Sequence, residues 1–100
     1  MPRAYWIAHV TVTNPDQYKF YAEAAPEAFR KHGATILARG GKSQQMEGHG
    51  RPRNVVIEFP DYETALACYH SPEYQENIKV RQPHSVADLI IIEGYDGPQP

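Results

Sequence analysis

The sequence predicts an α+β fold in which helices cover one face of a four-stranded antiparallel sheet. Three observations carry this prediction. Four apolar segments are rich in β-branched and aromatic residues, the segments that separate them include two with helical spacing, and proline or glycine marks most of their ends. The length of 100 residues is that of one domain, so we expect residues 1–100 to share one core.

The first two elements are a strand and a long helix. Residues 4–12 carry aromatic and β-branched side chains on both alternating faces, which is typical of a strand covered on both sides. The motif Asn-Pro-Asp at 14–16 is a helix start, with a capping side chain, a proline at the first helical position and an acid at the positive helix end. We expect the helix to end near Gly33, with a kink or a restart at Pro26, because proline removes one helical hydrogen bond.

The middle of the chain predicts two strands joined by an exposed loop. The strands are residues 34–40 and 54–59, and the polar residues 42–53 form a strand extension and a hairpin loop. Gly40 and Gly41 permit a bend or a bulge at the end of the first of these strands.

The last third predicts a broken helix and a final strand. Asp61 is placed to cap one helix, and the motif Ser-Pro-Glu at 71–73 repeats the start signal for another. Pro83 ends that helix and residues 86–93 form the last strand. Residues 95–100 are rich in glycine and proline and are expected to be a flexible tail.

The resulting β-α-β-β-α-β order is the ferredoxin-like arrangement, in which right-handed crossovers bring the helices to one face of the sheet. The other face is apolar as well and therefore needs a cover. The simplest cover is the same face of a second copy about a two-fold axis. We therefore expect a homodimer through the sheet face.

The composition limits the kinds of binding partner and the cellular compartment that we expect for this protein. Ten Lys and Arg against twelve Asp and Glu give a formal net charge of −2, which argues against nucleic-acid binding. No apolar run reaches the roughly 20 residues of a membrane span, and the first residues lack a signal-peptide pattern. The single cysteine excludes an intramolecular disulfide. We expect a cytoplasmic protein that does not associate with membranes.

Five stretches in chain order carry a resemblance to a known family: residues 5–8, 12–15, 38–41, 56–60 and 69–75. Together they resemble the dimeric α+β barrel superfamily and, within it, the domain-of-unknown-function family thirteen-thirty. The resemblance implies a ferredoxin-like fold and a dimer, and it implies no established activity. Related barrels include monooxygenases without cofactor, lactone isomerases, haem-dependent enzymes and small-molecule sensors, and a pocket between sheet and helices is frequent among them.

Candidate catalytic groups are His9 and Glu58. His9 lies mid-strand among apolar neighbours, where it is either an acid–base group in the helix-side pocket or a buried or interface histidine with a satisfied hydrogen bond. Glu58 lies in an otherwise apolar strand, where it is either a base or the structural partner of Arg39.

Candidate ligand-binding residues are Arg39, Tyr69, Tyr74 and Arg81. Arg39 stands beside two glycines and could hold a ligand carboxylate, or it pairs with an acid of this chain or of a second copy. The two tyrosines place hydroxyl groups in a pocket or serve as core aromatics. Arg81 shares a helix face with Tyr74, where it guards the pocket mouth or is solvated.

The remaining reactive residues predict no catalytic or metal site. Ser71 is expected to be a helix cap, and Cys68 a small buried hydrophobe that points away from His70 two positions later. The histidines show no metal-ligand spacing and no glycine-rich phosphate loop occurs, so we expect no metal and no cofactor.

Three functions remain open from the sequence. The chain binds, and as an enzyme transforms, a small anionic or aromatic organic metabolite in a pocket between sheet and helices. Alternatively it is a non-catalytic sensor or carrier, or a protein-interaction module that uses its dimer face or its tail. A histidine and a carboxylate in contact within the pocket would favour catalysis, whereas a pocket whose polar residues are only arginine and tyrosine would favour binding.

Overall fold

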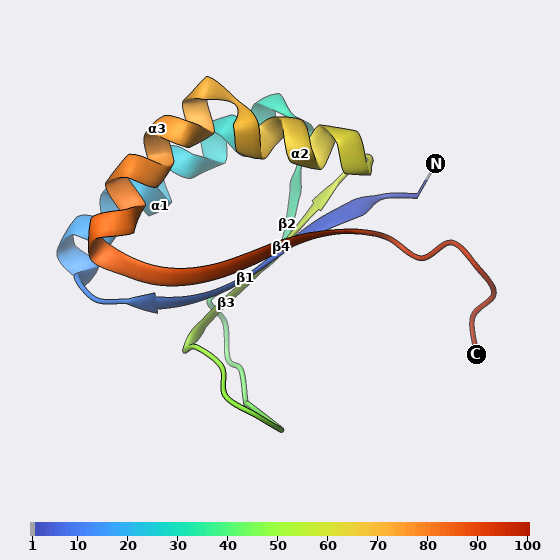
Figure 1. Cartoon of the computed structure of the whole chain (residues 1–100), viewed down its shortest axis with the longest axis horizontal. Helices are drawn as coiled ribbons and strands as arrows, with labels where there is room; N and C mark the ends of the chain where they lie inside the picture. Colours follow the sequence, from blue (N-terminus) through green and yellow to red (C-terminus); the bar gives the residue numbers. More distant parts are fainter. Residues whose placement is uncertain (1) are drawn as a thin grey trace.

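The computed structural model describes residues 2–100, and its four strands form one antiparallel sheet of order β2–β3–β1–β4. The elements follow one another as β1 (Ala4–Val12), α1 (Pro15–Lys31), β2 (Thr35–Arg39), β3 (Arg53–Phe59), α2 (Tyr62–His70), α3 (Pro72–Arg81), a 3-10 turn (Gln82–His84) and β4 (Ser85–Glu93). The three α-helices lie over one face of the sheet (Figure 1), so the predicted ferredoxin-like fold class is confirmed. None of the described helices combines the length and the apolar character needed to cross a lipid bilayer.

The helices begin where the capping signals predict. The side chains of Asn14, Asp61 and Ser71 each accept a hydrogen bond from the backbone N–H three residues later, at 3.3, 2.7 and 3.3 Å. Each bond satisfies one of the free N–H groups that a first helical turn leaves open. Ser71 separates α2 from α3 and is a cap, as predicted.

α1 runs without interruption through Pro26, so a restart of the helix at this residue is excluded. Pro26 has no N–H to donate to the carbonyl of Ala22, which would be its partner in an unbroken helical ladder. Nη2 of Arg39 donates to that carbonyl instead, at 2.8 Å. A side chain from β2 thus supplies the hydrogen bond that the proline removes from α1.

The core lies between the sheet and the helices and is centred on Trp6, which is 2% exposed. Its ring is surrounded by four aromatic rings at centroid distances of 4.9 to 5.9 Å, those of Phe29, Phe59, Tyr69 and Tyr74. The indole Nε1 donates to the carbonyl of Ala65 at 3.0 Å, which satisfies its polar atom inside the core. One side chain of β1 therefore contacts α1, α2 and α3.

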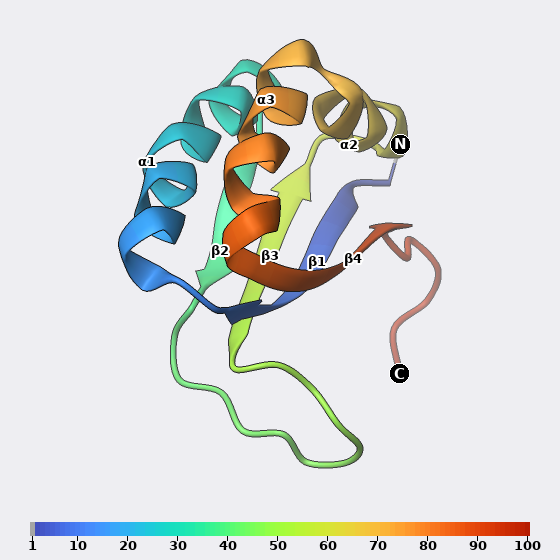
Figure 2. The same ribbon diagram turned by 60° about the vertical axis from the view of Figure 1, so that its left-hand side comes forward.

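The opposite face of the sheet, which we call the outer face, is apolar and open. It carries the side chains of Tyr5, Ile7, Val56, Val86, Ile90 and Ile92. The three residues of β4 in this group are between 46% and 54% exposed. The loop between β2 and β3 projects away from the helices, and the chain after β4 leads away from the sheet (Figures 1 and 2). These side chains form an apolar patch on the outer face, and polar side chains, among them His9, Glu58 and Asp88, lie beside it on the same face.

Replacing Trp6 by alanine is expected to lower the free energy of unfolding by about 3–5 kcal/mol, because the truncation leaves a cavity at the centre of the core. Urea denaturation followed by circular dichroism, at one fixed protein concentration, measures the change. Met46→Ala in the exposed loop is the control and should change the stability by less than about 0.5 kcal/mol. A loss below about 1 kcal/mol for Trp6→Ala would contradict this view of the core.

Candidate functional site

A cavity of about 60 Å³ lies between the sheet and the helices, toward the end of the fold where β1 ends and α1 begins. The aromatic rings of Trp6 and Phe29 form part of its wall together with aliphatic side chains of the sheet. The titratable side chains of the wall are those of Tyr18, Tyr21, Arg39, Arg53, Tyr74 and Arg81. The cavity thus combines an apolar interior with guanidinium and phenol groups, as ligand pockets commonly do.

Two tyrosines of α1 enter this wall because they are three residues apart on one side of the helix. The rings of Tyr18 and Tyr21 have centroids 5.4 Å apart. The hydroxyl of Tyr21 lies 2.6 Å from the hydroxyl of Tyr74 and forms a hydrogen bond with it. This bond links α1 to α3 across the cavity wall.

Arg39 reaches the cavity because β2 contains a β-bulge. The pairing register of β2 with β3 shifts by one residue at Leu37, and the shift places Arg39 opposite Val55 on the helix side of the sheet. Side chains alternate along a strand, so without the extra residue Arg39 would point to the outer face. The bulge therefore directs this guanidinium toward the helix side, where it bonds the free carbonyl of α1.

Arg53 and Arg81 lie against the two tyrosines of α1. The guanidinium carbon of Arg53 is 5.7 Å from the ring centroid of Tyr18, and that of Arg81 is 5.7 Å from the ring centroid of Tyr21. Both distances allow a cation–π interaction. Gly40 has a φ of 68°, and a Cβ at this position would collide with the guanidinium of Arg53, so glycine leaves the space that Arg53 needs.

The charge of the cavity wall is positive and uncompensated. Within residues 2–100, no Asp or Glu lines the cavity, and the ion pairs of arginine involve Arg3, Arg30 and Arg51 rather than the arginines of the wall. The Nε atoms of Arg53 and Arg81 are buried and have no hydrogen-bond partner. An unpaired buried donor costs about 1–3 kcal/mol, so these two arginines are held in place at a cost in stability.

The two hydrogen-bonded phenols of the wall, those of Tyr21 and Tyr74, remain protonated. Burial raises the pKa of Tyr21 well above its ordinary value, and the neighbouring Tyr74 raises it further. Burial also raises the pKa of Tyr74, against the opposing effects of its hydrogen bond to Tyr21 and of the charge of Arg81. At neutral pH these groups donate hydrogen bonds and do not act as bases.

The structure brings some of the predicted site residues together. Arg39, Tyr74 and Arg81 line the cavity. Tyr69 lies beside it in the aromatic core, with its ring 5.9 Å from that of Trp6, and is outside the cavity wall. Among residues 2–100, no group of three or more His, Cys, Asp or Glu side chains could hold a metal ion.

His9 and Glu58 lie on the side of the sheet turned away from the helices, so the alternative that placed His9 as an acid–base group in the helix-side pocket is wrong. Nδ1 of His9 is hydrogen-bonded to the side-chain oxygen of Asn54, and Glu58 pairs with Arg3 at 3.5 Å. The proposed alternative of an ion pair between Glu58 and Arg39 is also wrong, because these side chains lie on opposite faces of the sheet. The residues of β1 are apolar on both faces, and the sequence therefore did not show which face meets the helices.

The sequence interpretation missed Tyr18, Tyr21 and Arg53 as site residues. The helical spacing of Tyr18 and Tyr21 marks them in the sequence only as part of the apolar stripe of α1. Arg53 alternates with Val55 and Ile57, which face the helices, and this period of two was a usable signal.

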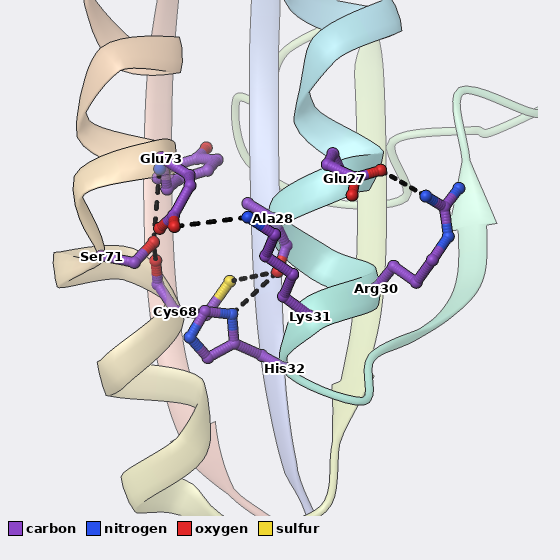
Figure 3. A network of polar contacts seen from close by, with 9 residues as sticks. Glu27, Ala28, Arg30, Lys31, His32, Cys68, Ser71 and Glu73 are labelled. Carbon is purple, nitrogen blue, oxygen red and sulfur yellow. Dashed lines mark hydrogen bonds and ion pairs between the residues drawn. The ribbon is translucent and has the colours of Figure 1, made fainter.

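A separate polar cluster joins the end of α1 to α2 and α3 (Figure 3). The carbonyl of Ala28 accepts hydrogen bonds from Nδ1 of His32 at 2.8 Å and from the thiol of Cys68 at 3.7 Å. Lys31 pairs with Glu73 at 3.5 Å in the same region. Burial raises the pKa of the Cys68 thiol to about 12, with a smaller contribution from the charge of Glu73. Cys68 is fully buried, and its contacts dock the helices on one another.

A family model matches nearly the whole chain. The matching model is "Domain of unknown function (DUF1330)", over residues 3–95. No protein with a curated description matches the sequence.

Solved structures share the fold at low sequence identity. RPA0582, a protein of unknown function from Rhodopseudomonas palustris, has a TM-score of 0.75 at 17% identity over 96% of this chain and 85% of its own. SnoaB, a cofactor-independent oxygenase from Streptomyces nogalater, has a TM-score of 0.65 at 11% identity over 100% and 97%. A candidate antibiotic biosynthesis monooxygenase from Caulobacter crescentus has a TM-score of 0.66 at 7% identity over 95% and 92%. At these identities the likeness shows the fold alone.

The thiol of Cys68 is expected to react with Ellman's reagent at pH 8 at least about 100-fold more slowly in the native protein than in urea. The raised pKa keeps the sulfur in its unreactive thiol form, and burial blocks the reagent. Absorbance of the released thiolate measures both rates. A native rate within a few-fold of the unfolded one would show that the sulfur is accessible.

Proposed function

We propose a function for this chain, which belongs to the family "Domain of unknown function (DUF1330)", from the chemistry of its cavity. The cavity binds a small organic anion between the sheet and the helices. The observation that carries the proposal is the group formed by Arg39, Arg53 and Arg81, which face an apolar cavity without a carboxylate partner. Arginine in such a setting holds a carboxylate through two parallel hydrogen bonds.

The guanidinium groups of Arg53 and Arg81 supply the donors for the anion, and their Nε atoms have no other hydrogen-bond partner. A carboxylate can accept one hydrogen bond from Nε and one from the adjacent amino group of the same guanidinium. Such a ligand would remove the cost of the unpaired donors and neutralise part of the local positive charge. Arg39 already uses one amino group for the carbonyl of Ala22, and its role would be to add positive charge at the cavity.

The size and the wall of the cavity limit the rest of the ligand. A volume of about 60 Å³ holds a few non-hydrogen atoms, so a larger ligand would extend through the opening. The wall is mainly aromatic and aliphatic, which favours an apolar ligand body. We therefore assign the cavity to short-chain or single-ring organic acids.

The polar groups of the wall favour binding over catalysis. They are guanidinium and phenol groups, and the histidine and the carboxylate that were candidate proton-transfer groups, His9 and Glu58, lie across the sheet. A sensor or carrier needs only the affinity that such donors supply. Titrations that also record product formation would distinguish this role from catalysis.

We also propose that two copies of the chain associate through the outer face. Its exposed isoleucines, Ile90 and Ile92, belong to an apolar patch that spans the central strands. Burying such a patch against an identical one removes apolar surface from water on both sides. The cavity opens on the helix side of the sheet, so association would leave it accessible.

Replacing Arg53 or Arg81 by glutamine is expected to weaken the binding of isobutyrate and of 2-phenylpropanoate at least tenfold, because a charge-assisted hydrogen bond is lost. Titration followed by NMR chemical shifts measures the dissociation constants. Arg30→Gln, on the exposed side of α1, is the matched control and should bind like the wild type. Equal affinity for the uncharged amides of the two acids would refute the proposed anion site.

Replacing Ile90 by glutamate is expected to convert a dimer into a monomer, because two-fold packing would bury two carboxylates in an apolar interface. Native mass spectrometry, with a denatured control, gives the subunit count and the mass of any retained ligand. Val80→Glu on α3 places the same charge away from the sheet and should leave the dimer intact. A wild-type monomer would contradict the proposed association.

A further inference from the structure

The hydroxyl groups of Tyr21 and Tyr74 hold one proton more than their mutual hydrogen bond uses. The two oxygens are 2.6 Å apart, and either one can be the donor. Two protonated phenols carry two protons, and one of these lies between the oxygens. The second proton has no acceptor among the hydrogen bonds of the described residues, although both tyrosines line the cavity.

This second proton is a directed donor at a partly dry site. Burial keeps both phenols in the neutral form, as their raised pKa values indicate. The hydroxyl that accepts the mutual hydrogen bond keeps its own proton, and accepting this bond polarises its O–H group and makes it a better donor. A carbonyl oxygen can accept this hydrogen bond because it has lone pairs and no proton of its own.

The hydroxyl pair is close to a cation. The guanidinium carbon of Arg81 lies 5.7 Å from the ring centroid of Tyr21, on the wall of the same cavity. A small molecule with a carboxylate at Arg81 could therefore place an adjacent oxygen near the hydroxyl pair. Acids that carry a carbonyl group next to the carboxylate have this arrangement.

We propose that the Tyr21–Tyr74 hydroxyl pair donates a hydrogen bond to a carbonyl oxygen of the ligand and makes the cavity selective for 2-oxo acids. The inference rests on the proposed function, because the arginines of the wall hold the carboxylate. To that proposed function it adds the chemical class of the ligand. The arginines recognise any small organic acid, and the hydroxyl pair distinguishes an acid with a carbonyl next to the carboxylate from one without it.

Two pairs of organic acids test this selectivity, and the two acids of each pair are similar in size and shape. Pyruvate is compared with isobutyrate, and benzoylformate with 2-phenylpropanoate, so that a carbonyl oxygen replaces a methyl group in each pair. The wild type should bind the 2-oxo acid of at least one pair about three- to tenfold more tightly, as one neutral hydrogen bond allows. The dissociation constants come from the NMR titration used for the arginine variants.

The deciding variant removes both hydroxyl groups, as Tyr21→Phe with Tyr74→Phe. Removal of both avoids leaving one phenol free to donate alone, and it keeps the ring packing. The preference for the 2-oxo acid, taken as the ratio of the two dissociation constants of a pair, should fall to about one. Tyr69→Phe, in the aromatic core beside the cavity and outside its wall, is the matched control and should keep the preference.

The outcomes separate this inference from the function on which it rests. Equal binding of both acids of each pair by the wild type, with loss of binding in Arg53→Gln, would overturn the selectivity and retain the anion site. A preference that survives in the double variant would also overturn it. Failure of every probe to bind the wild type would overturn both the anion site and the selectivity.

Discussion

The packing around Trp6 is the interaction on which the rest of the structure depends. Its ring lies on the central strand β1 and contacts aromatic rings from each of the three helices, while its indole nitrogen bonds a carbonyl of α2. Tyr74, whose ring centroid is 4.9 Å from that of Trp6, is held by this contact with its hydroxyl at Tyr21. The packing of the core therefore fixes the geometry of the cavity wall. No loop is needed to position Tyr74 in that wall.

Arg39 shows how one side chain can serve the fold and the site together. Proline at position 26 leaves the carbonyl of Ala22 without its helical partner, and the guanidinium from β2 fills this gap. The side chain reaches the carbonyl only because the bulge at Leu37 turns it to the helix side. The proline, the bulge and the arginine form one structural unit that places a positive charge at the cavity. Because Arg39 also stabilises the fold, replacing it would disturb the structure together with ligand binding. Arg53 and Arg81 have buried donors without partners and are therefore the better probes of ligand binding.

Local chemistry was predictable from the sequence, and long-range pairing was not. The caps at Asn14, Asp61 and Ser71 act on neighbours in the chain, and the structure confirms the helix starts that they mark. The position of His9 depends on which face of β1 meets the helices, and both faces have the same apolar character. The direction of Arg39 depends on a register shift against a strand that is distant in sequence. Tyr74 and Arg81 share a helix face, and the sequence placed both at the cavity; Arg39 reaches it as well, through a bulge that the sequence did not locate.

The uncompensated arginines also connect binding to stability. Positive charges grouped in a partly dry cavity repel one another, and buried donors without partners add to that cost. The aromatic packing of the core has to offset this cost in the empty protein. An anion that satisfies the donors removes part of it, and because the cavity exists only in the folded chain, the binding free energy is added to the free energy of unfolding. The same arrangement that makes the empty fold less stable is thus the one on which the proposed binding of an anion rests.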